Sequence, residues 1–129
     1  MSKEFNKWNI LKQELHGRKK ENYFKERDVF WVSIGVNVGF EQDGKGKIFS
    51  RPVLVMKKYN KNMFLGIPLS TQIKQGSFFF EFLLNGKPSN ALLVQTRVYD
   101  AKRLENKIGK INQEDFNNLK SRFRELVNV

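Results

Sequence analysis

The sequence has 129 residues, of which 40% are hydrophobic and 29% charged, so one compact domain is expected and two are not. Lysine and arginine outnumber aspartate and glutamate by 24 to 13, and the net charge of +11 favours a polyanion as ligand, although a solubility charge alone is the alternative. The absence of cysteine excludes disulfides, zinc–thiolate sites and cysteine nucleophiles. Because no run approaches a membrane span or a secretion signal, we expect a cytoplasmic protein that does not bind a membrane.

The chain begins with a predicted helix. From Lys3 to His16, apolar residues recur at three- and four-residue steps, and Gly17 is the expected stop. A basic connector follows, so we expect residues 1–26 to form an N-terminal extension and residues 27–129 the main domain. Whether the helix lies on its own domain, extends a dimer or occupies a groove is left open by the sequence.

The middle of the chain has the pattern of short antiparallel strands. Five runs rich in valine, isoleucine and aromatics are separated by glycine, asparagine and lysine, which predicts a meander: 28–34, 51–58, 62–69, 77–84 and 90–98. Asn85-Gly86 and residues 59–62 are expected turns. So many short strands in about 70 residues favour a strongly bent sheet or a closed barrel, because closure hides strand edges.

Two further segments complete the predicted fold. The glycine-rich stretch 35–50 is longer than a usual hairpin loop and is a candidate lid. Near the end, Asn112 is a good helix N-cap, and Phe116, Leu119, Phe123 and Leu126 form an apolar stripe expected to dock on the sheet. Segment 102–109 is predicted to form a helical turn that ends at Gly109.

Residues that commonly perform catalysis are few. A single histidine, His16, excludes a two-histidine acid–base pair and is expected at the surface. The carboxylates fall singly on separate predicted elements, so a magnesium cluster has no support, and no phosphate-binding loop is present. We therefore expect no metal and no cofactor. The remaining candidates for chemistry are arginine, hydroxyl and lysine side chains.

Four fragments then occur in one order. The loop contains Gly39, Glu41 and Gln42, and an Arg51-Pro52 pair begins the next predicted strand. A hydroxyl residue, Ser70 or Thr71, ends the strand after it, and Gln95-x-Arg97 follows later. Any one fragment is weak, but in this order and with this spacing the sequence resembles the MazF/PemK family of toxin ribonucleases from about residue 27 to residue 127.

The resemblance implies an α+β, mainly β fold: a small SH3-like antiparallel barrel with a C-terminal helix, to which this chain adds the N-terminal helix. It implies a homodimer that cleaves single-stranded RNA without metal, by attack of the ribose 2′-hydroxyl on the adjacent phosphate, and that is silenced by a cognate antitoxin protein. Arg51 would stabilise the phosphorane charge, and its high pKa makes it a poor base. Ser70, with Thr71 in reserve, would hydrogen-bond the reacting group.

The same resemblance and the local charge suggest further RNA-binding residues: Glu41, Gln42, Lys45, Lys47, Lys57, Lys74, Gln95 and Arg97. Some members carry a carboxylate just before the matched glutamine, where this chain has Val94, so the general base is in doubt. The phenylalanines at 78–80 and 82 offer a base-stacking platform, but core packing is the favoured interpretation, as it is for Phe30 and Trp31.

Two other functions remain open. A gyrase-poisoning toxin of the same barrel type would act on DNA and leave RNA intact. A catalytically inactive barrel would bind nucleic acid without cutting it, and the missing carboxylate and added helix are compatible with that function.

Overall fold

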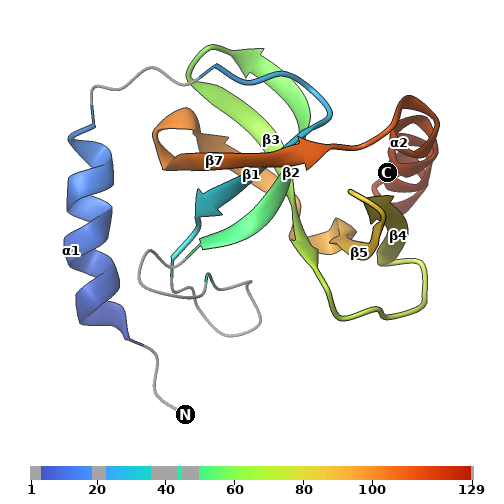
Figure 1. Ribbon diagram of the computed structural model, residues 1–129, viewed down its shortest axis with the longest axis horizontal. Helices are drawn as coiled ribbons and strands as arrows, with labels where there is room; N and C mark the ends of the chain where they lie inside the picture. The colour runs from blue at the N-terminus through green and yellow to red at the C-terminus, as the bar shows by residue number, and fades with distance from the viewer. Residues whose placement is uncertain (1–3, 19–22, 36–43, 45–49, 129) are drawn as a thin grey trace.

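The computed structural model describes residues 4–18, 23–35, 44 and 50–128. Seven strands and two α-helices form the fold (Figure 1). Their bounds in chain order are α1 (Phe5–His16), β1 (Asp28–Ser33), β2 (Ser50–Asn60), β3 (Met63–Ser70), β4 (Phe79–Leu84), β5 (Lys87–Leu92), β6 (Arg97–Asp100), β7 (Leu104–Lys110) and α2 (Gln113–Leu126), with short 3-10 turns η1 (Leu93–Gln95) and η2 (Ala101–Arg103).

The strands make one antiparallel, strongly bent sheet in the order β4-β5-β3-β2-β1-β7, and β6 pairs with β3 beside this path. The mainly β fold with two helices is therefore as expected, but the hydrogen-bonded path among the described residues does not close into a barrel. The simple meander is also wrong, because β5 rather than β4 pairs with β3.

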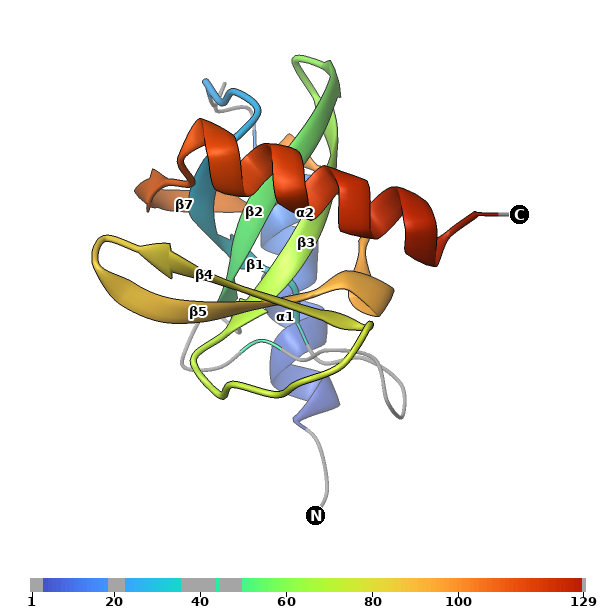
Figure 2. The same ribbon diagram turned by 90° about the vertical axis from the view of Figure 1, so that its right-hand side faces the viewer.

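The two helices lie on opposite sides of the sheet, since α2 crosses in front of β2 and β3 in Figure 2 and α1 lies behind them. The apolar stripe of α2 buries Phe116 and Leu119 against Val29, Leu54 and Ile67 of the sheet. Asn112 caps the helix as expected, with its side chain accepting the Asp115 N–H at 2.8 Å.

A second apolar cluster covers the opposite face of the sheet. Val53 and Val55 of β2 contribute to it, together with Phe64 of β3 and Tyr99 of β6. Phe64 lies between Phe24 and Tyr99, with ring centroids 5.2 and 5.7 Å away. Successive side chains of a strand point to opposite faces of the sheet. Arg51 lies two residues before Val53, so its side chain leaves the strand on the same face as Val53.

Helix α1 attaches to the domain through few side chains. It begins at Phe5 and ends at His16, with Gly17 at its C-cap, close to the predicted bounds. Only Trp8 and Leu15 are buried along it, and the Trp8 ring occupies the space that a side chain would need at Gly35. Of the three locations that the sequence left open, the helix lies on its own domain.

Two segments differ from the prediction. Of residues 102–109, expected to form a helical turn, 102 and 103 lie in the 3-10 turn η2, whereas 104–109 belong to strand β7, which pairs with β1. Residues 90–98, expected as one strand, are divided by η1 between β5 and β6. The Asn85-Gly86 turn is confirmed: both residues have positive φ, 52° and 78°, as the tight turn between β4 and β5 requires.

Candidate active site

A cavity of about 850 Å³ lies where β2 begins and β3 ends. The turn between β4 and β5 borders it on one side and the middle of β7 on the other. The lining residues come from six strands and their ends: Trp31, Ser50, Arg51, Pro52, Leu69, Ser70, Thr71, Leu84, Asn85, Lys87, Pro88, Ser89, Glu105, Asn106 and Ile108. The cavity thus gathers the predicted arginine and both predicted hydroxyl residues.

Arg51 is a largely buried residue in the wall of this cavity. Only 9% of the residue is exposed, and its Nη1 donates to the Leu69 carbonyl at 3.4 Å. The guanidinium also lies close enough to Tyr99 to affect the pKa of that phenol. A buried guanidinium at a cavity wall is a fixed source of positive charge in a site where water screens little.

Ser70 lies on the strand beside Arg51. The pairing of Val53 with Pro68, extended by two residues, places Ser70 opposite Arg51, so the two side chains start on the same face. Its Oγ accepts the Gln72 N–H at 3.1 Å, which leaves the hydroxyl hydrogen available to donate to a ligand. Thr71 follows the end of β3 and is exposed.

Three arginines surround Tyr99 behind this pair. Arg97 lies over the Tyr99 ring, 4.9 Å from its centroid. Burial raises the pKa of Tyr99 to about 12, while the charges of Arg97, Arg103 and Arg51 act in the opposite sense. Burial is also the main cause that lowers the pKa of Arg103, followed by the charge of Arg97. All three arginines thus lie close enough to one buried phenol to affect its pKa.

The structure does not bring all the predicted RNA-binding residues to the cavity. Lys57 is exposed and pairs with Leu65, far along β2 from Arg51. Lys74, in the segment after β3, accepts a hydrogen bond from Asn90 through its carbonyl and does not line the cavity. Gln95 and Arg97 lie at η1 and β6, outside the cavity lining.

The remaining predicted positions, Glu41, Gln42, Lys45 and Lys47, lie outside the described residues, as does most of the candidate lid. Of the predicted site residues that the structure describes, only Arg51, Ser70 and Thr71 line the cavity. His16 is exposed, as expected, and belongs to a different part of the molecule.

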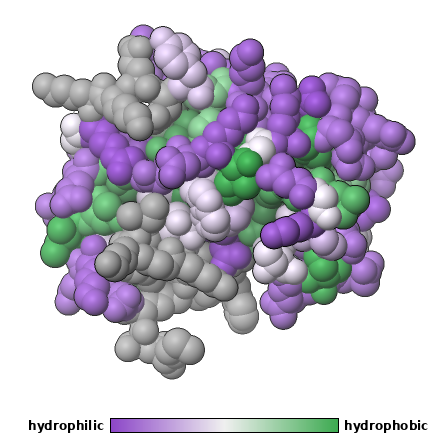
Figure 3. Space-filling model, viewed as in Figure 1, coloured by the Kyte–Doolittle hydropathy of each residue, from purple (hydrophilic) through white to green (hydrophobic). Residues whose placement is uncertain are grey.

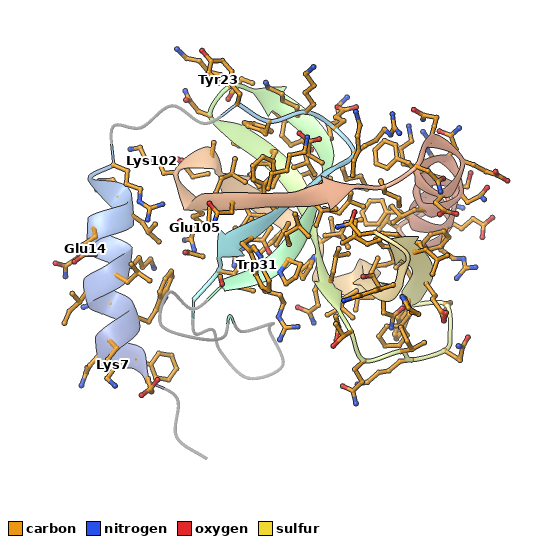
Figure 4. All side chains as sticks on the ribbon, viewed as in Figure 1. Lys7, Glu14, Tyr23, Trp31, Lys102 and Glu105 are labelled. Carbon is orange, nitrogen blue, oxygen red and sulfur yellow. The ribbon has the colours of Figure 1, made fainter. Side chains whose placement is uncertain are left out.

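Two cavity residues were not singled out by the sequence. Trp31, expected in the core with Phe30, is 41% exposed and lines the cavity, whereas Phe30 is buried. Glu105 is the one carboxylate among the lining residues; its Oε1 accepts from Ser33 Oγ at 3.0 Å and lies 2.9 Å from Arg18 Nη1. Figure 4 shows Trp31 and Glu105 on neighbouring strands. Neither position has a signal in a single sequence, because strand pairing is what brings Trp31 and Glu105 to the cavity wall.

The aromatic run of β4 packs mainly as predicted. Phe82 is buried in the core, and the Phe80 ring stacks beside it with centroids 6.4 Å apart. Phe78 precedes the strand and is 51% exposed. A group of three or more histidine or acidic side chains suited to a metal ion does not occur in the parts of the chain that are described.

Solved structures share this fold. MazF (Form-I) from Deinococcus radiodurans is 18% identical, with a TM-score of 0.69 over 84% of this chain and 100% of that one. The Mycobacterium tuberculosis toxin MazF-mt6 is 13% identical, with a TM-score of 0.61 over 80% and 98%. An endoribonuclease in complex with its cognate antitoxin from Mycobacterial species is 8% identical, with a TM-score of 0.63 over 83% and 97%. At these identities the likeness establishes the fold, that of small toxin proteins.

Sequence comparison establishes the family. The sequence model of the PemK-like, MazF-like toxins of type II toxin–antitoxin systems matches residues 25–127. The chain belongs to this family. Helix α1 precedes the matched segment. No curated protein matches the chain. Neither helix in the described segments is long and apolar enough to cross a membrane.

Proposed function

We propose that this chain is a cytoplasmic endoribonuclease toxin that cleaves single-stranded RNA without a metal ion. The observation that carries the proposal is the meeting of Arg51 and Ser70 in one cavity, from adjacent strands and on one face of the sheet. Membership of a toxin family and a net charge of +11 support RNA as the polyanion bound there.

The reaction needs little from the protein beyond charge and position. The ribose 2′-hydroxyl loses its proton as its oxygen bonds to the adjacent phosphorus; the bond from phosphorus to the 5′-oxygen breaks and that oxygen gains a proton, which leaves a cyclic phosphate and a 5′-hydroxyl. Arg51 presents two parallel N–H donors to the phosphate oxygens, where negative charge grows in the transition state. Ser70 donates its hydroxyl hydrogen to a phosphate oxygen or accepts from the attacking hydroxyl.

The proposed partners follow from the family. A cognate antitoxin protein is supported by the complexes among the structural relatives, which include MazE-MazF (Form-II) from Deinococcus radiodurans. We also propose a homodimer as the working unit, which sedimentation at two protein concentrations tests directly. A monomer at both concentrations would contradict the dimer without affecting the cleavage chemistry.

The central experiment incubates purified protein with single-stranded RNA in EDTA. We expect cleavage to give cyclic-phosphate and 5′-hydroxyl ends, and expect it to be lost in Arg51→Ala. Arg124→Ala, an exposed arginine at the end of α2, is the matched control and should keep activity. Dependence on added metal would contradict the mechanism. Damage to DNA with intact RNA would identify a gyrase poison, and RNA binding without products would identify an inactive barrel.

A further inference from the structure

A second, smaller cavity of about 130 Å³ lies between α1 and η2. The C-terminal half of α1 supplies Lys12, Leu15 and His16, and the η2 segment supplies Asp100, Lys102 and Arg103. Liquid water occupies about 30 Å³ per molecule, so the space suits a group the size of a phosphate rather than a nucleoside. Half of its wall comes from the helix that precedes the family match.

The cavity is cationic. Lys12, Lys102 and Arg103 face a single carboxylate, Asp100, which accepts the Lys102 N–H at 2.8 Å and so caps η2. Lys102 Nζ donates to the His16 carbonyl at 3.1 Å, between η2 and the end of α1 (Figure 4). Within the described part of the chain, no ion pair joins Lys12, Lys102 or Arg103 to a carboxylate.

Arg103 is the most constrained of these cations. Its Nη1 donates to the Ser33 carbonyl at 3.2 Å, and its guanidinium lies 5.6 Å from the centroid of the Trp8 ring. It is partly buried beside a like charge, Arg97. A desolvated cation next to another cation costs free energy, which a bound anion recovers. The pocket therefore has the chemistry of an anion site.

The pocket is also connected to the candidate active site. Arg103 Nη1 donates to the Ser33 carbonyl, and Ser33 pairs in the sheet with Ser50, which lines the larger cavity beside Arg51. A strand with its scissile phosphate at Arg51 comes to Arg103 if it runs toward α1. We propose that the pocket between α1 and η2 binds a backbone phosphate of the RNA, away from the cleaved bond; this rests on the proposed nuclease function.

The kinetic test removes two of the positive charges. For Lys12→Gln/Lys102→Gln we expect KM for single-stranded RNA to rise several-fold with kcat unchanged. The slope of log KM plotted against log salt concentration should become smaller by about 0.7, which is the value expected for the loss of one phosphate contact with a single strand. The control Lys7→Gln/Lys110→Gln removes the same charge from two exposed lysines outside the pocket and should keep the wild-type slope.

Loss of the Lys102 contact could loosen α1, so Lys12→Gln is measured alone. Lys12 is exposed and makes no hydrogen bond or ion pair in the described structure. A smaller rise in KM in the same direction supports the pocket. A rise in the double variant with none in Lys12→Gln would assign the effect to the helix and overturn the proposal, as would equal behaviour of the double variant and its control.

His16 provides a direct readout, because it is the sole histidine of the sequence and lines the pocket. In Arg51→Ala protein, which keeps RNA intact, adding single-stranded RNA should shift the imidazole NMR signals, and the two lysine substitutions should remove that shift. A shift with inorganic phosphate but none with RNA would mark a free-anion site and overturn the proposal. If wild-type protein cuts no RNA, the nuclease function fails, while His16 still reports whether RNA occupies the pocket.

Discussion

Arg51 and Ser70, the two residues proposed to act on the phosphate, are brought together by strand register. Neither is distinctive alone, and the sequence singled them out only through the order of the surrounding motifs. The structure places them in one cavity, with Arg51 buried and hydrogen-bonded to Leu69. The sequence therefore named these two cavity residues, whereas the places of Trp31 and Glu105 in the cavity wall depend on tertiary structure.

The first prediction distinguishes charge from geometry at position 51. Arg51→Lys keeps the positive charge but loses the planar pair of donors, so kcat for RNA cleavage should fall by roughly 10²-fold, the scale for losing one well-placed transition-state donor. Single-turnover cleavage measures the step directly. Wild-type rates in the lysine variant would show that charge alone is sufficient.

The second prediction concerns Tyr99 and alkaline pH. Because burial raises its pKa from 10.0 to about 12, the neutral phenol stabilises the fold fully below pH 10, and that contribution disappears as the pH rises through 12. The shift corresponds to about 2–3 kcal/mol. Urea unfolding at pH 9 to 12 should show a steeper loss of stability in wild type than in Tyr99→Phe. Parallel curves would contradict a buried neutral Tyr99.

At the scale of elements, periodicity predicted the two helices and most strands, but it failed at β7. Residues 104–110 contain lysine, glutamate and asparagine without clear alternation, and only Leu104 is buried. Their strand conformation comes from pairing with β1 at the edge of the sheet, where charged residues are common because they discourage further strand addition. Tertiary pairing thus overrides a weak local preference, which no single-sequence pattern reveals.

The third prediction tests how α1 is attached. A Cβ built at Gly35 would come within 2.0 Å of the Trp8 ring, and the positive φ of 83° disfavours other residues there. Gly35→Ala should destabilise the protein by about 1–3 kcal/mol and displace α1, measured by urea unfolding and tryptophan fluorescence. In a Trp8→Ala background the same substitution should cost much less, leaving only the backbone term. An equal cost in both backgrounds would mean that the indole is not the obstacle.

At the scale of the whole molecule, the net charge is +11. Hydrophilic side chains cover much of the face seen in Figure 3, with hydrophobic residues in separate patches. Nothing in the two apolar cores distinguishes an RNA-binding protein, so the functional inference depends on charge, family and the cavity. A chain of net charge +11 should bind RNA through counterion release as well as through specific contacts.

The fourth prediction follows from that charge. Raising the salt concentration from 50 to 200 mM should weaken RNA binding roughly tenfold or more, with log Kd linear in log salt. Arg97→Ala, at the exposed arginine over Tyr99, should reduce the slope by about 0.7, measured by fluorescence anisotropy with an uncleavable strand. Arg124→Ala serves again as the control. A salt-independent Kd would indicate that recognition is not electrostatic.

The contact between Trp8 and Gly35 also gives the packing of α1 a recognisable signature in sequence. An indole can occupy that position only where the facing residue has no side chain, so the tryptophan and the glycine form a matched pair. A relative with a helix in this position should therefore carry the indole only together with the glycine. The pair can be sought in other sequences as a marker of a helix packed in this place.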